Sequence, residues 1–182
     1  MTKTNANIWV VPLLGIVVYA NSLGGAFHYD DFHSLVENNA IRSWDNALAF
    51  FVDPSLFSAD VSKAMYRPLL LLSYAFNYAV GGYDVMGYHI LNILFHAVAS
   101  VLVTLVAGRL FGDRQGALLS GMLFAVHPLT SEPVNYISSR SESLMACFYL
   151  ATLYCYMSRG ESARWWSPFF YACALLTKSV AL

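Results

Sequence analysis

The feature that most constrains this chain is an unbroken apolar run from Tyr88 to Leu110 whose first charged residue is Arg109. A helix needs about 20 mostly apolar residues to cross the hydrocarbon core of a bilayer, so this run predicts a membrane span. The composition agrees, because 58% of the residues are hydrophobic and 12% are charged, against about 25% charged in soluble domains. A soluble monomer would have to expose large apolar patches, so we predict an integral membrane protein.

Four further apolar segments extend this prediction to an all-α helix bundle of about five spans, with residues 1–182 forming one transmembrane domain. They are residues 8–23, 115–126, 144–157 and 165–182. If the spans alternate, the basic residues of the short turns gather at one end, which the positive-inside rule places in the cytoplasm. These residues are Lys3, Arg109, Arg114, Arg159 and Arg164. The alternative for the first segment is a secretory signal cleaved after Val18-Tyr19-Ala20.

This topology turns two longer segments, 24–87 and 127–143, to the outer side of the membrane. In segment 24–87, Ser43 is predicted to cap an interfacial helix, because Trp44, Leu48, Phe51 and Val52 recur at helical spacing. The apolar stretch 69–80 begins after Tyr66-Arg67-Pro68 and ends at Gly81-Gly82. It is short for a span and is predicted to lie on the surface or to re-enter the membrane.

An acidic pair, Asp30 and Asp31, follows the first span directly, at the level where a lipid-linked headgroup lies. An ionised carboxylate in this position is able to take the proton of an attacking hydroxyl, which is general-base catalysis. Two alternatives stay open. The pair belongs to an ordinary solvated loop, or it joins His28 and His33 in a metal site, although the spacing matches no specific zinc pattern.

The second outer loop, 127–143, carries the pattern Ser139-x-x-Glu142, a capping box that predicts the start of the fourth span. The amino end of that helix would then offer free amide groups to a phosphate, and Arg140 would add a bidentate contact. The alternatives are capping alone for Glu142 and a snorkelling side chain for Arg140. His127 and Glu132 are either site residues or ordinary loop residues.

His89, Asn92 and His96 are spaced three and four residues apart, so they share one face of the predicted second span. His96 lies deepest, where an ionisable group indicates either function or a buried hydrogen bond to another helix. A transporter would need several ionisable groups near the midplane, and His96 alone qualifies, so this function is the least favoured.

Four blocks then appear in an order that resembles a known family. They are FHYDDFHSLVENNAI, YRPLLLLSYAFNYAVGGYDVMGYHILNILFH, FAVHPLTSEPVNYISSRSESL and ALLTKSVAL. Their order and spacing resemble the N-terminal membrane region of the transmembrane and tetratricopeptide-repeat O-mannosyltransferases and their bacterial relatives, which are glycosyltransferases of the GT-C class. The resemblance covers the chain from about Phe27 to its end.

The resemblance implies transfer of a sugar such as mannose from a polyprenyl-phosphate donor to a protein Ser/Thr or another hydroxyl acceptor, protein or glycan, on the outer face. It implies Asp30 as the base with Asp31 as its partner, and Arg140 as a contact of the donor phosphate. Lys178, near the outer end of the fifth predicted span, either joins the phosphate site or snorkels. The remaining matches to family positions are His89, Asn92, His127, Glu132 and Glu142. No cofactor is firmly implied, a divalent metal stays open, and no metal ligands are assigned.

Family members continue well beyond Leu182, so we expect this chain to be a truncated, N-terminal part of a larger module with weak or no activity alone. The outer loops lack Asn-x-Ser/Thr acceptor sites, which favours a bacterial inner membrane with a cytoplasmic N-terminus and periplasmic loops. The alternative function is a non-catalytic membrane protein that binds a lipid phosphate or acts as an assembly subunit. The expected surroundings are membrane lipid, and a net charge of −1 predicts no nucleic-acid partner.

Overall fold

The structure, a computed structural model, describes residues 8–158 and 160–181. Every regular element in this part is helical, which confirms the all-α prediction. The α-helices are α1 Val10–Tyr19, α2 Pro68–Gly81, α3 Val85–Phe111, α4 Arg114–Val126, α5 Ser131–Asn135, α6 Arg140–Tyr156 and α7 Glu161–Thr177. Short 3-10 turns occupy most of the remainder, with a π-type turn at Phe32–Val36. Lys3, Arg159 and Leu182 lie outside the described residues.

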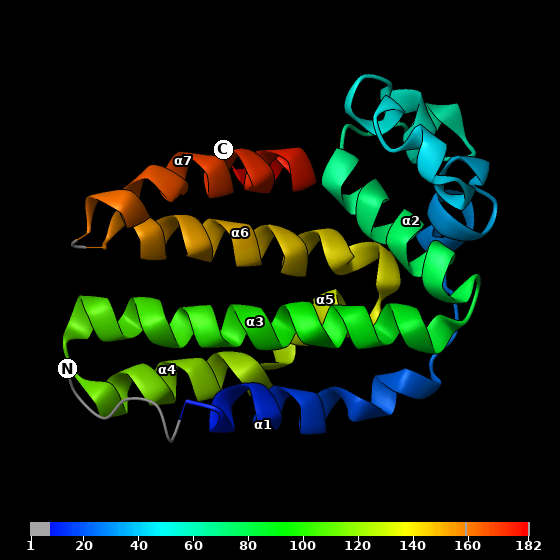
Figure 1. The fold of residues 1–182 in the computed structure, drawn as a ribbon. Helices are drawn as coiled ribbons and strands as arrows, with labels where there is room; N and C mark the ends of the chain where they lie inside the picture. The colour runs from blue at the N-terminus through cyan, green and yellow to red at the C-terminus, as the bar shows by residue number, and fades with distance from the viewer. Residues whose placement is uncertain (1–7, 159, 182) are drawn as a thin grey trace.

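Helix α3 lies at the centre of a bundle (Figure 1), with α6 packed on one side and α1 and α4 on the other. Helix α7 packs on the outer side of α6. The 27 residues of α3 extend about 40 Å at 1.5 Å per residue. This helix begins three residues before the predicted start at Tyr88, because the side chain of Asp84 accepts a hydrogen bond from the amide of Met86 and caps it.

Among the described helices, α3 alone has both the length and the apolar character needed to cross a membrane. The segments Val10–Gly24 and Pro68–Gly81 are apolar but shorter, and α6 and α7 have 17 residues each. Large apolar side chains are nevertheless exposed on several helices, including Val98, Leu123 and Phe169. The number of spans therefore stays a prediction.

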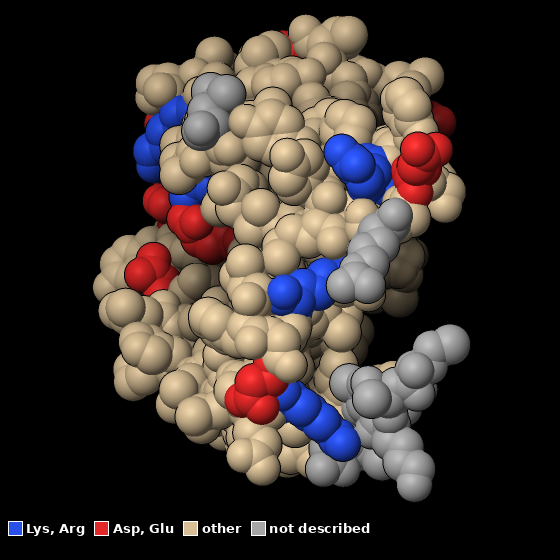
Figure 2. Space-filling model, turned by 90° about the vertical axis from the view of Figure 1, so that its left-hand side faces the viewer, with Lys and Arg blue, Asp and Glu red and all other residues tan. Residues whose placement is uncertain are grey.

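The long loop between α1 and α2 and the connection from α4 to α6 meet at one end of the bundle (Figure 1). The backbone amide of Asp30 donates to the hydroxyl of Tyr136 at 2.8 Å, and the amide of Ser138 donates to Asp31 at 2.8 Å. The α3–α4 and α6–α7 turns lie at the opposite end, where Figure 2 shows basic and acidic side chains next to each other at several places on a largely uncharged surface. The two predicted outer loops thus lie together in the fold, and their place outside the membrane stays a prediction.

The interfacial helix predicted from Trp44 is wrong. Ser43 does cap the segment, accepting from the amide of Asp45, but the chain forms separate 3-10 turns at Trp44–Asn46 and Ala49–Phe51. The side chain of Asn46 bonds the carbonyl of Ala40, and such bonds compete with a continuing helix. Pro54, which starts the next turn, lacks the amide hydrogen that an extended helix would use.

Buried apolar residues of the long loop form a small core against α2. This core comprises Leu35, Ile41, Phe50, Phe57, Leu70, Leu71, Tyr74, Ala75, Tyr88 and Ile137. Helix α2 ends at Gly81, as predicted, because Gly82 adopts a φ of 59°, a conformation that favours glycine. The loop is therefore a folded layer that is held on α2.

Candidate active site

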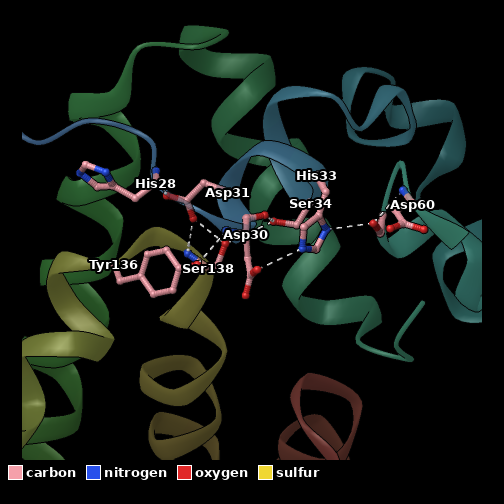
Figure 3. A network of polar contacts seen from close by, with 9 residues as sticks. His28, Asp30, Asp31, His33, Ser34, Asp60, Tyr136 and Ser138 are labelled. Atoms are coloured by element: carbon pink, nitrogen blue, oxygen red, sulfur yellow. Dashed lines mark hydrogen bonds and ion pairs between the residues drawn. The ribbon is translucent and has the colours of Figure 1, made fainter. Parts of the chain in front are cut away.

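The carboxylate of Asp31 is completely buried, with 0% of the residue exposed. One of its oxygens accepts hydrogen bonds from the amide and the hydroxyl of Ser138, and the other accepts from the amide of His28 at 2.9 Å. Figure 3 shows this carboxylate pointing at Ser138 between the first and the second loop. Asp31 therefore joins the two loops, and both of its oxygens have partners.

The carboxylate of Asp30, in contrast, is 63% exposed. One oxygen lies 3.3 Å from Nε2 of His33, whose Nδ1 lies 2.9 Å from the hydroxyl of Ser58 (Figure 3). The preceding residue, Tyr29, has a φ of 42°, which is uncommon outside glycine and occurs preferentially where local structure imposes it. Asp30 is thus held from one side and open on the other, which is what a general base requires.

Asp30 and His33 line a cavity of about 420 Å³ between the long loop and the start of α2. Two cations, Lys63 and Arg67, line the same cavity, together with the hydroxyl groups of Ser34, Ser62 and Ser138. Sequence reasoning missed both cations. Arg67 stands in the block YRPLLLL, but its position opposite Asp30 depends on how the loop folds onto α2.

Arg67 is half-buried at the entry to α2. Its guanidinium donates to the hydroxyl of Ser141 at 3.3 Å and lies 5.6 Å from the ring centre of Phe57. Burial lowers the pKa of Arg67, and the charge of Glu142 opposes this shift. An arginine stays charged at neutral pH even after such a shift, so the cavity has a cation that is only partly solvated.

Arg140 is fully buried, with 0% exposed, and does not reach the outer surface. Its Nε donates to the side-chain oxygen of Asn92 at 2.7 Å, and its two terminal nitrogens donate to the carbonyls of Ser73 and Tyr88. The guanidinium also lies 5.0 Å from the ring centre of Tyr74. Arg140 therefore holds α2, α3 and α6 together, in place of the snorkelling side chain that was the alternative.

The predicted capping box at the start of α6 does not form. Ser139 occupies the N-cap position, as predicted, but its hydroxyl donates to Glu132 at 3.3 Å instead of capping the helix. Glu142 forms an ion pair with Lys178, which follows the end of α7. Lys178 thus lies at the loop end of the bundle but outside the residues that line the cavity.

The polar face of α3 points into the protein, and His89, Asn92 and His96 are all buried. His96 lies 3.0 Å from the carbonyl of Ala125 and joins α3 to α4. This is the buried hydrogen bond to another helix that was the alternative to a functional role. His89 lacks a hydrogen-bond partner for either ring nitrogen. His127 is exposed, and its Nδ1 accepts from the amide of Leu129, so it caps a turn away from the cavity.

The metal alternative for the first loop finds no matching geometry. Within residues 8–158 and 160–181, no three His, Cys, Asp or Glu side chains are arranged to hold a metal ion. Figure 3 shows His28 and His33 on opposite sides of the acidic pair, and Asp31 is directed at Ser138.

Comparison with known proteins shows to which family the chain belongs. A family model described as "Dolichyl-phosphate-mannose-protein mannosyltransferase" matches residues 10–182. The chain therefore belongs to this family, which confirms the resemblance found in the sequence.

Several animal proteins are similar over most of the chain. Protein O-mannosyl-transferase tmtc2 of Xenopus laevis is 36% identical over 179 residues, covering 91% of this chain and 21% of the frog protein. TMTC2 of Mus musculus is 33% identical over 93% of this chain and 22% of its own length. Tmtc1 of Drosophila melanogaster is 35% identical over 93% of this chain and 20% of its own length. The chain spans about a fifth of these relatives, and no solved structure gives a significant match.

Proposed function

We propose that this chain forms the donor side of a membrane glycosyltransferase that moves mannose from a lipid phosphate to a protein hydroxyl. The cavity of about 420 Å³ carries the proposal, because it sets the exposed carboxylate of Asp30 in one chamber with Lys63 and Arg67. A transferase of this kind needs a base for the hydroxyl and cations for the departing phosphate. Membership of a mannosyltransferase family supports the choice of reaction.

In the proposed reaction, the carboxylate of Asp30 accepts the proton of the acceptor hydroxyl as its oxygen bonds to the anomeric carbon. The bond between that carbon and the phosphate oxygen breaks, and the lipid phosphate leaves with both electrons and one more negative charge. Arg67 and Lys63 stabilise that charge. His33, 3.3 Å from the base, orients its carboxylate, and attack opposite the leaving group inverts the anomeric configuration.

The roles expected of Arg140 and Lys178 are reassigned in this proposal. The nitrogens of Arg140 are bonded within the protein, so we propose that Arg67 and Lys63 contact the phosphate in its place. Lys178 forms an ion pair with Glu142, and Arg67 donates a hydrogen bond to Ser141, the residue before Glu142. We propose that the ion pair fixes the segment that Arg67 contacts. Asp31 is proposed to keep the loop of the base attached to Ser138.

The membrane setting is proposed as follows. Helices α1, α3, α4, α6 and α7 form about five spans, and the loop end faces the compartment where the donor's sugar is exposed. The exposed apolar side chains of α3, α4 and α7 support burial in lipid. A bacterial inner membrane remains the preferred site from the sequence, and the animal origin of the relatives named above does not bear on it.

The test expresses the full reading frame that encodes this chain in membranes, with a labelled polyprenyl-phosphate mannose and a threonine-containing peptide. We expect Asp30→Asn to reduce transfer by about 100-fold or more, the range of general-base catalysis, while donor retention stays at the wild-type level. Arg67→Gln should instead weaken donor retention. Glu37→Gln, which removes an exposed loop carboxylate outside the cavity, is the matched control.

Undiminished transfer by Asp30→Asn would contradict the assignment of the base. If the wild-type chain retains the donor in an Arg67-dependent way but transfers its sugar to no peptide, the alternative of a lipid-phosphate-binding protein takes the place of the transferase.

A further inference from the structure

A second pocket of about 620 Å³ lies on the other side of the Asp30 segment. Its walls come from the end of α1, the first loop, α3 and α5, and they include His28, Tyr29, His89, Glu132 and Tyr136. The hydroxyl of Tyr136 accepts a hydrogen bond from the amide of Asp30. Figure 3 shows His28 and Tyr136 on the side of the acidic pair that faces away from His33. The backbone of Asp30 is therefore tied to a wall of this pocket, while its carboxylate, 63% exposed, lines the cavity on the other side.

His89 is the unusual group in this pocket. The residue is 1% exposed, yet within residues 8–158 and 160–181 neither of its ring nitrogens has a hydrogen-bond partner. Nearly all buried polar groups in proteins have a hydrogen-bond partner. Asn92 and His96, on the same face of α3, both have partners, so the unpaired ring is a local feature of the pocket wall.

Gly25 lies directly against this ring. A Cβ atom at Gly25 would stand 2.6 Å from Nε2 of His89, whereas a Cβ atom at Gly24 would meet nothing within 4 Å. Gly25 has a φ of −70° and a ψ of 176°, which any residue adopts. A side chain at Gly25 would therefore fill the space next to His89, and it would not strain the backbone.

The chemistry of this pocket differs from that of the cavity with the cations. Lys and Arg are absent from its lining residues, which include the amides of Asn21 and Asn135 and the carboxylate of Glu132. Amide and hydroxyl side chains offer both donors and acceptors, and they match the N–H and C=O groups that every peptide unit carries. Several of the lining side chains are exposed, so the pocket is open to a ligand from outside.

We propose that this pocket binds the polypeptide acceptor, with the reactive Ser or Thr hydroxyl at Asp30 and the adjoining backbone over Gly25. A small displacement of the Gly24–Gly25 segment lets Nε2 of His89 bond the bound chain. Burial raises the pKa of Tyr136, so its hydroxyl stays protonated next to Asp30. Glu132 disfavours acceptors with an acidic residue beside the hydroxyl. This assignment rests on the proposed function.

The experiment measures peptide capture separately from transfer. The full chain in lipid nanodiscs is photo-crosslinked to a nine-residue probe with one central threonine, neutral flanks and a benzophenone side chain. We expect at least tenfold weaker crosslinking for Gly25→Ala and His89→Leu, and wild-type crosslinking for Gly24→Ala. His89→Gln, which restores a donor and an acceptor, should recover part of the signal. A probe with aspartate beside the threonine should crosslink less.

Retention of a labelled polyprenyl-phosphate mannose and the melting temperature are measured on the same variants. Donor retention should stay at the wild-type level, because the pocket contains no phosphate contact, and it shows that a variant is folded even where crowding at Gly25 lowers the melting temperature. Equal peptide capture by Gly25→Ala and Gly24→Ala would overturn the proposal, as would a loss of donor retention with peptide capture unchanged, which would assign the pocket to the sugar. Failure of the wild-type chain to retain the donor would count against the proposed function alone.

Discussion

Asp30 and Asp31 are neighbours in the chain, but their side chains lie in opposite environments. One is exposed in a cavity with cations, and the other is buried against Ser138. The sequence left the role of this pair open, and the family resemblance implied Asp30 as the base. The burial of Asp31 was not predictable, because it depends on a contact with a residue 107 positions later in the chain.

This difference predicts that an Asp→Asn substitution lowers the stability of the fold at position 31 but not at position 30. Asp31→Asn replaces an acceptor that takes hydrogen bonds from Ser138 and His28 with an amide that has only one acceptor atom. We expect it to lower the free energy of unfolding by about 1–3 kcal/mol, the cost of leaving a buried donor unpaired. Thermal unfolding in detergent measures this loss, and Asp30→Asn, at the exposed neighbour, is the control. Equal melting temperatures for the two variants would contradict the structural role of Asp31.

Arg140 shows the same limit of sequence reasoning. Its position at the start of α6 was predicted, and the helix indeed begins there. Its direction was not, because the partners that draw it inward, Ser73, Tyr88 and Asn92, come from two other helices. A guanidinium with donors on three nitrogens suits such a junction, and a lysine in its place would have one charged nitrogen for these acceptors.

At the scale of elements, the long helices were predictable because each one coincides with a long apolar run in the sequence. The loop between α1 and α2 was not, because its backbone is held by side chains from distant positions. Asn38, for example, donates to the carbonyls of Ser34, Leu56 and Phe57. Composition and spacing do not report such pairings, so Lys63 and Arg67 were left out of the predicted site.

The contact between α3 and α4 depends on one glycine. A Cβ atom at Gly121 would stand 1.9 Å from the hydroxyl oxygen of Thr104 and 3.1 Å from the carbonyl of Ser100. We expect Gly121→Ala to destabilise the fold by about 1–3 kcal/mol through overpacking. Gly108→Ala is the matched control on the same pair of helices, since its Cβ would lie 3.5 Å from Ala117, an ordinary contact.

Thermal unfolding of both variants checks this expectation, and the addition of Thr104→Ala should recover part of the loss at Gly121 because the two residues share one contact. Equal stability of the two alanine variants would show that α4 moves away from α3 at little cost.

At the scale of the whole molecule, alternation of the helices was enough to predict that the two loops meet. In the structure the two loops contact each other, but their shared side of the membrane stays a prediction, and the crossing of α4 is its weakest step. The 13 residues of α4 extend about 20 Å, whereas the hydrocarbon core is about 30 Å thick. If α4 does not cross, the second loop and the turn after α3 lie on the same side.

Cysteine labelling of sealed vesicles decides this question. In a background with Cys147, Cys155 and Cys173 replaced by alanine, single cysteines are placed at Leu48 and Leu129 at the loop end and at Gln115 and Gly160 at the other. We expect an impermeant maleimide to reach the first two from one side and the last two from the other. Labelling of Leu129→Cys and Gln115→Cys from one side would show that α4 turns back. That result would also contradict the contact of Ser138 with Asp31, because the two loops would then lie on different sides of the membrane, so the number of spans and the shared site would fail together.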